Sequence, residues 1–69
     1  MAYDYSKLRG KIREVYGTQE AFADAMGIHP VTISRKLNNQ LDWTREEMDK
    51  ACVLLGIPLE EVPLYFFAQ

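Results

Sequence analysis

Few residues of this 69-residue chain have the types and spacing that catalysis or metal binding requires. With one cysteine, Cys52, and one histidine, His29, the chain can form neither an internal disulfide nor a zinc site of cysteines and histidines. Carboxylates cluster at 46–49 and 60–61, where a solvated helix start is the simpler interpretation, because acidic side chains favour that end of the helix dipole. The sequence therefore predicts no enzyme activity, no cofactor and no metal site.

The basic residues could also do chemistry, and they are unevenly distributed. A net charge of −2 opposes binding to the phosphate backbone of nucleic acid. Residues 1–39 nevertheless carry six basic and four acidic side chains, whereas residues 40–69 carry two basic and six acidic ones. The chain therefore combines a mildly basic front half, of charge +2, with an acidic back half, of charge −4.

Length and composition predict one folded domain over residues 1–69. The chain is half the size of an ordinary domain, and its 48% hydrophobic content is ample for a small core. The lone cysteine favours a reducing compartment. No apolar run is long enough to cross a membrane, and the first residues lack the features of a signal peptide, so a cytoplasmic location is expected.

Apolar periodicity and capping residues predict an all-α fold, a compact bundle of about five short helices. Thr18 is expected to cap the second helix, His29 to precede Pro30 at the start of the third, and Thr44 to form a capping box with Glu47. Asp4 is expected to cap the first helix, and Pro63 to interrupt the last, leaving a C-terminal aromatic tail, 64–69. The expected helices span about 5–16, 19–26, 30–38, 45–55 and 58–62.

Two of these helices form a motif. Residues 18–39 read Thr-Gln-Glu-Ala-Phe-Ala-Asp-Ala-Met-Gly-Ile-His-Pro-Val-Thr-Ile-Ser-Arg-Lys-Leu-Asn-Asn, and their two short helices with a glycine-containing turn predict a helix-turn-helix at about 18–38. The segment resembles the helix-turn-helix of lambda-repressor-like, Cro/CI-type regulators, and the whole chain is similar to a small phage or prophage Cro-like repressor. It departs from that family at Lys36, where an aliphatic residue is usual, so Leu37 is expected to fill the core instead.

The resemblance implies a sequence-specific transcriptional repressor that binds a double-stranded DNA operator and reads its major groove with helix 30–38. Arg35 could bind guanine O6 and N7 in a bidentate manner. The family's base-reading positions match Pro30, Val31, Thr32 and Arg35. The expected phosphate contacts are Thr18, Gln19, Lys36, Asn38, Asn39 and Gln40.

Several of these residues also have a purely structural interpretation. Arg35 and Lys36 could form a solvated face, Gln19 could be an ordinary surface residue, and Asn38 with Asn39 could only cap and turn the chain. Lys7 and Arg9 of the first helix are expected to be solvated.

The aromatic tail and the acidic back half support an alternative function. Leu64, Tyr65, Phe66 and Phe67 cannot all be buried on one side, so some are expected to dock on the domain and others to contact a second copy in a homodimer. The alternative is a protein-interaction module that keeps the helix-turn-helix fold but has lost DNA binding, using the acidic helix 45–55 and the tail. The net charge of −2 favours this alternative, whereas Gln19, Arg35 and Lys36 favour DNA.

Overall fold

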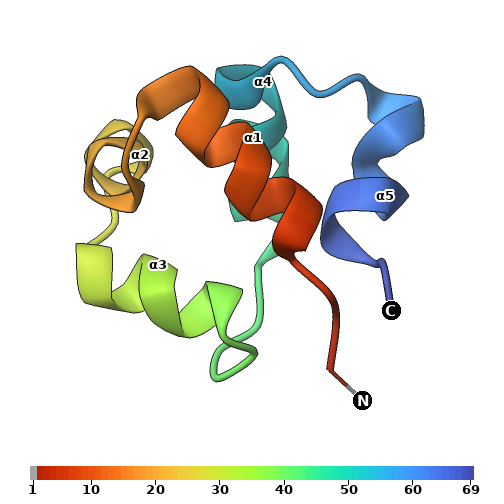
Figure 1. Ribbon diagram of the computed structural model, residues 1–69, viewed down its shortest axis with the longest axis horizontal. Helices are drawn as coiled ribbons and strands as arrows, with labels where there is room; N and C mark the ends of the chain where they lie inside the picture. Colours follow the sequence, from red (N-terminus) through yellow and green to blue (C-terminus); the bar gives the residue numbers. More distant parts are fainter. Residues whose placement is uncertain (1) are drawn as a thin grey trace.

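The computed structural model describes residues 2–69, and five α-helices and one 3-10 helix account for most of this part of the chain. These residues contain no strand and no helix long and apolar enough to cross a membrane. In Figure 1, α2 and α3 lie on one side of α1 and α5 on the other, while α4 lies behind α1. The predicted all-α bundle is thus confirmed. The elements are α1 (Ser6–Tyr16), α2 (Gln19–Met26), α3 (Pro30–Leu37), α4 (Arg45–Leu55), η1 (Leu59–Glu61) and α5 (Val62–Phe66).

Local capping explains why α2 and α4 have the predicted bounds. Thr18 Oγ1 accepts a hydrogen bond from the backbone N–H of Ala21 at 3.1 Å. Thr44 and Glu47 form the predicted capping box, with distances of 3.1 Å and 2.9 Å for its two hydrogen bonds. Gly27 and Gly56 end the two helices in the left-handed conformation, which glycine adopts without a steric penalty.

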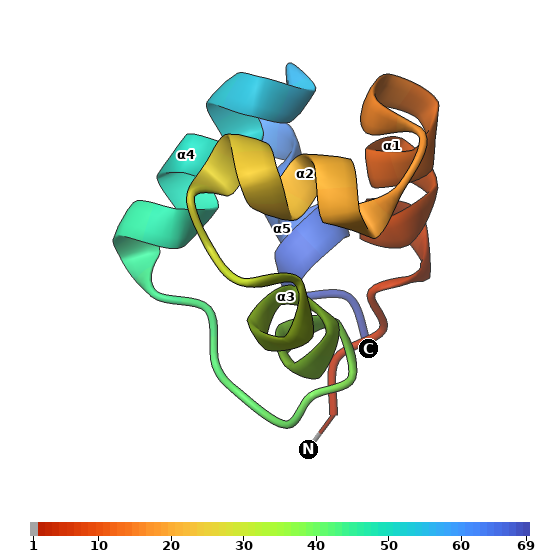
Figure 2. The ribbon, with the colours of Figure 1, turned by 90° about the vertical axis from the view of Figure 1, so that its left-hand side faces the viewer.

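The helix-turn-helix is present where the sequence predicts it. In Figure 2, α2 crosses above α3, which is seen nearly along its axis, and a short turn joins the two. His29 caps α3, because its Nδ1 accepts a hydrogen bond from the backbone N–H of Val31 at 3.2 Å, and Pro30 occupies the first turn. The side chain of Ala23 is completely buried on α2. This arrangement fixes which side of α3 faces solvent.

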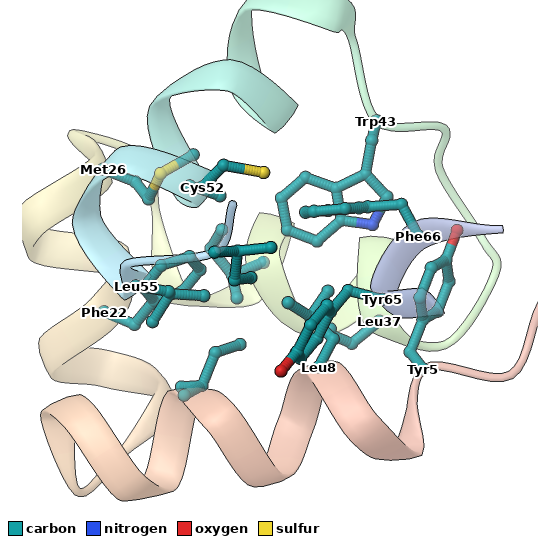
Figure 3. Close-up of a cluster of buried hydrophobic side chains, with 14 of the residues drawn as sticks. Tyr5, Leu8, Phe22, Met26, Leu37, Trp43, Cys52, Leu55, Tyr65 and Phe66 are labelled. Atoms are coloured by element: carbon teal, nitrogen blue, oxygen red, sulfur yellow. The ribbon is translucent and has the colours of Figure 1, made fainter. Parts of the chain in front are cut away.

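The core joins all five α-helices. Figure 3 shows Trp43 and Phe66 packed together with Tyr5 beside them, while Phe22 and Leu55 lie at the other end of the cluster. The ring centroids of Trp43 and Phe66 are 5.3 Å apart in an edge-to-face arrangement, which adds specific geometry to the burial of two large rings. The largest completely buried side chains are Phe22, Phe66, Leu8, Ile12 and Ile33.

Both ends of the chain differ from the prediction. The N-cap of α1 is Tyr5, not Asp4, although Asp4 Oδ1 still accepts a hydrogen bond from the backbone N–H of Ser6 at 2.9 Å. Pro63 does not interrupt the last helix, because it lies in the first turn of α5, where a proline is tolerated. The helix therefore continues to Phe66, and the segment expected to be a tail buries Tyr65 and Phe66 in the core.

Candidate interaction surfaces

The predicted base-reading residues lie on the solvent side of α3. Pro30, Val31 and Arg35 are exposed, with Val31 at 52%, and Thr32 is half-buried. Val31 and Arg35 are four residues apart and so share one face of the helix. The helix geometry thus brings these four residues together, but their exposure alone does not identify what they contact.

Lys36 does not lie on that surface. Its side chain is buried, with a residue exposure of 6%, and its Nζ donates to the carbonyl oxygen of Asp42 at 2.7 Å and pairs with Glu47 Oε1 at 2.8 Å. The ammonium group also lies 5.8 Å from the centre of the Trp43 ring. The prediction that Lys36 contacts a phosphate is wrong, because its charge is neutralised inside the protein. Leu37 is buried as predicted, so both residues fill the core side of α3.

The surroundings of Glu47 keep its carboxylate charged in the ion pair with Lys36. Burial acts to raise the pKa of Glu47, but hydrogen bonds from Lys36 and from the backbone N–H of Thr44 outweigh it and lower the pKa below its usual value. Glu47 is therefore ionised at neutral pH. One carboxylate serves both the capping box of α4 and the Lys36 ammonium group, so it links α4 to α3.

Other basic residues are also engaged within the protein. Arg9 Nη2 donates to the carbonyl oxygen of Leu37 at 2.9 Å and to Asn38 Oδ1 at 2.7 Å. Lys7 Nζ lies 5.2 Å from the centre of the Tyr65 ring, and Lys50 Nζ donates to the carbonyl oxygen of Met26 at 3.2 Å. The expectation that Arg9 is merely solvated is wrong, whereas Lys7 is exposed as expected. The contacts of Arg9 and Lys50 are with neutral oxygens, so these side chains keep their charge.

The remaining predicted phosphate contacts have mixed environments. Thr18 caps α2, and half-buried Gln19 lines an open hollow of about 480 Å³ between α1 and α2, together with Arg9 and Arg13. Gln40 is exposed. The side chain of Asn38 accepts the hydrogen bond from Arg9 described above. Because Lys36 is buried, it does not belong to the surface on which these predicted phosphate contacts lie.

Asn39 connects the N-terminal segment to the loop after α3. Its Oδ1 accepts from the backbone N–H of Tyr3 and its Nδ2 donates to the carbonyl oxygen of Tyr3, both at 2.9 Å. Its backbone φ of 62° is in the left-handed region, which asparagine tolerates better than most residues. The backbone N–H of Asp4 also donates to the carbonyl oxygen of Ala68 at 2.7 Å. The N-terminal segment is thus bound to both the loop and the C-terminus.

These contacts build a second hollow, of about 350 Å³, which we call the aromatic hollow. The rings of Tyr3 and Phe67 are 5.8 Å apart and those of Tyr5 and Trp43 are 6.5 Å apart, and Phe67 is 47% exposed. Burial raises the pKa of the Tyr5 hydroxyl, and electrostatic repulsion from Tyr3 and from the Asp42 carboxylate, which disfavours a second negative charge, raises it further. The aromatic hollow is lined by Tyr3, Tyr5, Asp42, Trp43, Met48, Phe66 and Phe67.

Trp43, which lines the aromatic hollow, carries a buried donor without a partner. Among residues 2–69, the buried Nε1 of Trp43 has no hydrogen-bond acceptor. A buried donor without an acceptor costs free energy, of the order of 1–3 kcal/mol. The sequence predicts the aromatic tail but not this hollow, because its walls come from the N-terminus, the loop before α4 and the C-terminus.

Comparisons with known proteins place the fold in context. The family described as "Protein of unknown function (DUF739)" matches residues 1–69. Among solved structures, the chain is similar to the solution structure of the modulator of repression (MOR) of the temperate bacteriophage TP901-1 from Lactococcus lactis. The two share 48% sequence identity with a TM-score of 0.85, over 97% of this chain and 90% of that one. No curated protein matches the chain.

The similarity to the modulator overturns the prediction of a sequence-specific DNA-binding repressor. The structure that shares almost half of this sequence belongs to a modulator of repression, which favours the alternative of a protein-interaction module. The geometry bears on one of the predicted phosphate contacts, because the charge of Lys36 is neutralised by Glu47. Arg35, in contrast, is exposed on α3.

Proposed function

The chain belongs to the family described as "Protein of unknown function (DUF739)", and we propose that it is a modulator of repression that acts by binding another protein. The observation that carries this proposal is the 48% identity to the bacteriophage modulator of repression over 97% of the chain. The partner is the DNA-binding repressor of the same phage or prophage. The modulator changes the affinity of that repressor for its operator without binding the operator itself.

The aromatic hollow is the surface that we assign to the repressor. Aromatic residues are enriched at protein interfaces and among the residues that dominate binding energy. Phe67, which is 47% exposed, and half-buried Tyr3 present ring surface in the lining of the hollow. An apolar side chain of the repressor would fill the hollow and pack against these rings.

The first prediction concerns the effect on repressor and operator. Fluorescence anisotropy of a labelled operator duplex is measured with purified repressor, with and without this protein. We expect the apparent affinity of the repressor for the operator to change at least tenfold in the presence of the protein. We expect the protein alone to leave the anisotropy of the duplex unchanged at about 100 mM salt.

The variant Phe67→Ser tests the surface. It removes an exposed ring without emptying the core, and we expect it to weaken binding to the repressor at least tenfold in isothermal titration calorimetry. Val15→Ser is the matched control, since Val15 is a similarly exposed apolar residue on α1, outside the hollow lining. Wild-type affinity of Phe67→Ser would remove the aromatic hollow from the interface. Absence of any repressor binding would refute the proposed function itself.

A further inference from the structure

The open hollow between α1 and α2 lies away from the aromatic hollow. We call it the arginine hollow, because Arg9 and Arg13 line it together with Gly10 and Gln19. Of residues 2–69, no acidic residue contributes to its lining. In Figure 1, α2 and the end of α1 lie on the opposite side of the molecule from both chain termini. The arginine hollow is therefore a separate surface feature.

The two arginines of this hollow keep their charge. They are four residues apart on one face of α1, where like charges repel each other. Among residues 2–69, neither guanidinium group pairs with a carboxylate, since the ion pairs of this part of the chain involve other basic residues. The neutral oxygens of Leu37 and Asn38 hold Arg9 in place without removing its charge. An anion in the hollow would relieve the repulsion between the arginines.

Gly10 indicates that the hollow is meant to stay open. Glycine inside a helix lowers stability relative to alanine. The φ angle is positive at the other three glycines but not at Gly10, and a Cβ atom at Gly10 would meet no atom within 4 Å. Neither the backbone conformation nor the packing of the protein therefore requires glycine here. Its missing side chain leaves room for a bound group to approach the backbone of α1 closely.

The charges around the hollow distinguish between two kinds of anion. A guanidinium group binds a carboxylate or a phosphate through two parallel hydrogen bonds. The residues that follow Arg13 and Gln19 are Glu14 and Glu20, and both are exposed. A nucleic-acid backbone would bring a row of phosphates next to these carboxylates, whereas a single carboxylate in the hollow brings no further negative charge. The surroundings therefore favour a single carboxylate.

We infer that the arginine hollow binds an aspartate or glutamate side chain of a protein partner. The carboxylate accepts hydrogen bonds from Arg13 and from the N–H groups of Arg9 that Leu37 and Asn38 leave free. The inference rests on the proposed function only for the identity of the partner, which is the repressor. It does not depend on the aromatic hollow.

A titration of the full-length, isotope-labelled protein tests the site without the repressor. The probe is a tetrapeptide, capped at both ends, with glutamate at its two central positions, and the control peptide has glutamine there. At about 20 mM salt, we expect only the glutamate peptide to shift the Nε–Hε signal of Arg13 and the amide signals of Gly10 and Gln19. Inorganic phosphate and a DNA duplex of arbitrary sequence are titrated in parallel. Equal shifts with both peptides, or tighter binding of phosphate or DNA at these signals, would overturn the inference.

Two variants test the site with both the glutamate peptide and the repressor. Gly10→Leu fills the hollow from a position without steric conflict, and Arg13→Gln removes one of its charges. We expect each variant to bind both partners at least fivefold more weakly in calorimetry, while circular dichroism shows the wild-type fold. Arg45→Gln is the matched control, because this highly exposed arginine lies on α4, outside the lining, and its variant should bind as the wild type does.

The outcomes separate this inference from the proposed function. If Gly10→Leu and Arg13→Gln bind the repressor as tightly as the wild type, the inference is overturned and the proposed function stands. If the wild type binds the glutamate peptide but not the repressor, the proposed function is refuted and the carboxylate site is supported.

Discussion

At the scale of single residues, the burial of Lys36 removes a predicted phosphate contact from the helix-turn-helix. On a helix at the position of a DNA-reading element, a lysine suggests a phosphate contact. Here the ammonium group turns inward, pairs with Glu47 and donates to Asp42. A buried ion pair contributes little net stability, but removing one member leaves the other without a partner. The pair therefore fixes the arrangement of α3 and α4 more than it strengthens the fold.

The second prediction is that this pair makes stability depend on pH. The folded pKa of Glu47 is lowered, so its contribution to stability is present above its unfolded value, near pH 4.5, and is lost as pH falls through the folded pKa. We expect the free energy of unfolding of Glu47→Gln at pH 7 to be about 1.5–3 kcal/mol lower than that of the wild type. Between pH 7 and pH 3, the free energy of unfolding of the variant should fall less than that of the wild type. Urea unfolding followed by circular dichroism measures both quantities.

The control for this prediction is Glu46→Gln, which removes an exposed carboxylate from the same first turn of α4. Its stability at pH 7 should stay within about 0.5 kcal/mol of the wild type. Identical pH dependence of the wild type and Glu47→Gln would show that the Lys36 pair is not responsible.

At the scale of elements, the contacts at helix ends decide how the segments are connected. Arg9 of α1 binds the carbonyl end of α3, and Lys50 of α4 binds the carbonyl end of α2. Helix C-termini leave carbonyl groups without partners, and cations interact favourably with them. These two basic side chains therefore join pairs of helices, a role that neither residue reveals in the sequence.

The third prediction concerns the N-terminal segment, which forms part of the aromatic hollow. Asn39→Gly keeps the left-handed backbone available but removes both hydrogen bonds to Tyr3. We expect the amide of Tyr3 to exchange with solvent at least tenfold faster, while the amides of α1 and α2 exchange as before, in hydrogen-exchange NMR. Gln40→Ala, at the exposed next position, should leave Tyr3 unchanged. Undiminished protection of Tyr3 in Asn39→Gly would show that the segment is held by other contacts.

At the scale of the whole molecule, the C-terminal helix completes a core that would otherwise be small. A chain of 69 residues buries only about 60% of its unfolded surface, so each large buried ring is a considerable share of its stability. Phe66 is completely buried, whereas its neighbour Phe67 is 47% exposed. Phe66 therefore belongs to the core and Phe67 to the surface, as expected for a segment that cannot bury every ring.

The fourth prediction separates these roles. Phe66→Ala should lower the free energy of unfolding by about 3–5 kcal/mol, because it removes a large buried ring. Phe67→Ala should lower it by less than about 1 kcal/mol, since much of that ring remains in solvent. Thermal and urea unfolding measure both changes. Equal losses in the two variants would mean that Phe67 is as much a part of the core as Phe66.

The sequence by itself determined the elements. Helix bounds follow from local signals, such as the Thr44 and Glu47 capping box, the Thr18 cap and the left-handed Gly27 and Gly56, which act within a few residues. The helix-turn-helix follows from two such helices and a short turn. The sequence also predicts that some residues of the aromatic segment are buried. It does not locate the end of the last helix, because Pro63 is compatible with either a break or a first turn.

Only the tertiary structure decided what the surfaces can do. Whether a lysine on α3 points to solvent or into the protein depends on Glu47, Asp42 and Trp43, which arrive from a later part of the chain. The aromatic hollow likewise needs Tyr3 beside Phe67, residues from opposite ends of the sequence. Periodicity reports which side of a helix is apolar, but it cannot report which distant partner neutralises a charge or completes a cavity. Helix bounds depend on local signals, so the fold was predictable from the sequence, whereas the inward position of Lys36 and the walls of the aromatic hollow depend on long-range contacts and were not predictable.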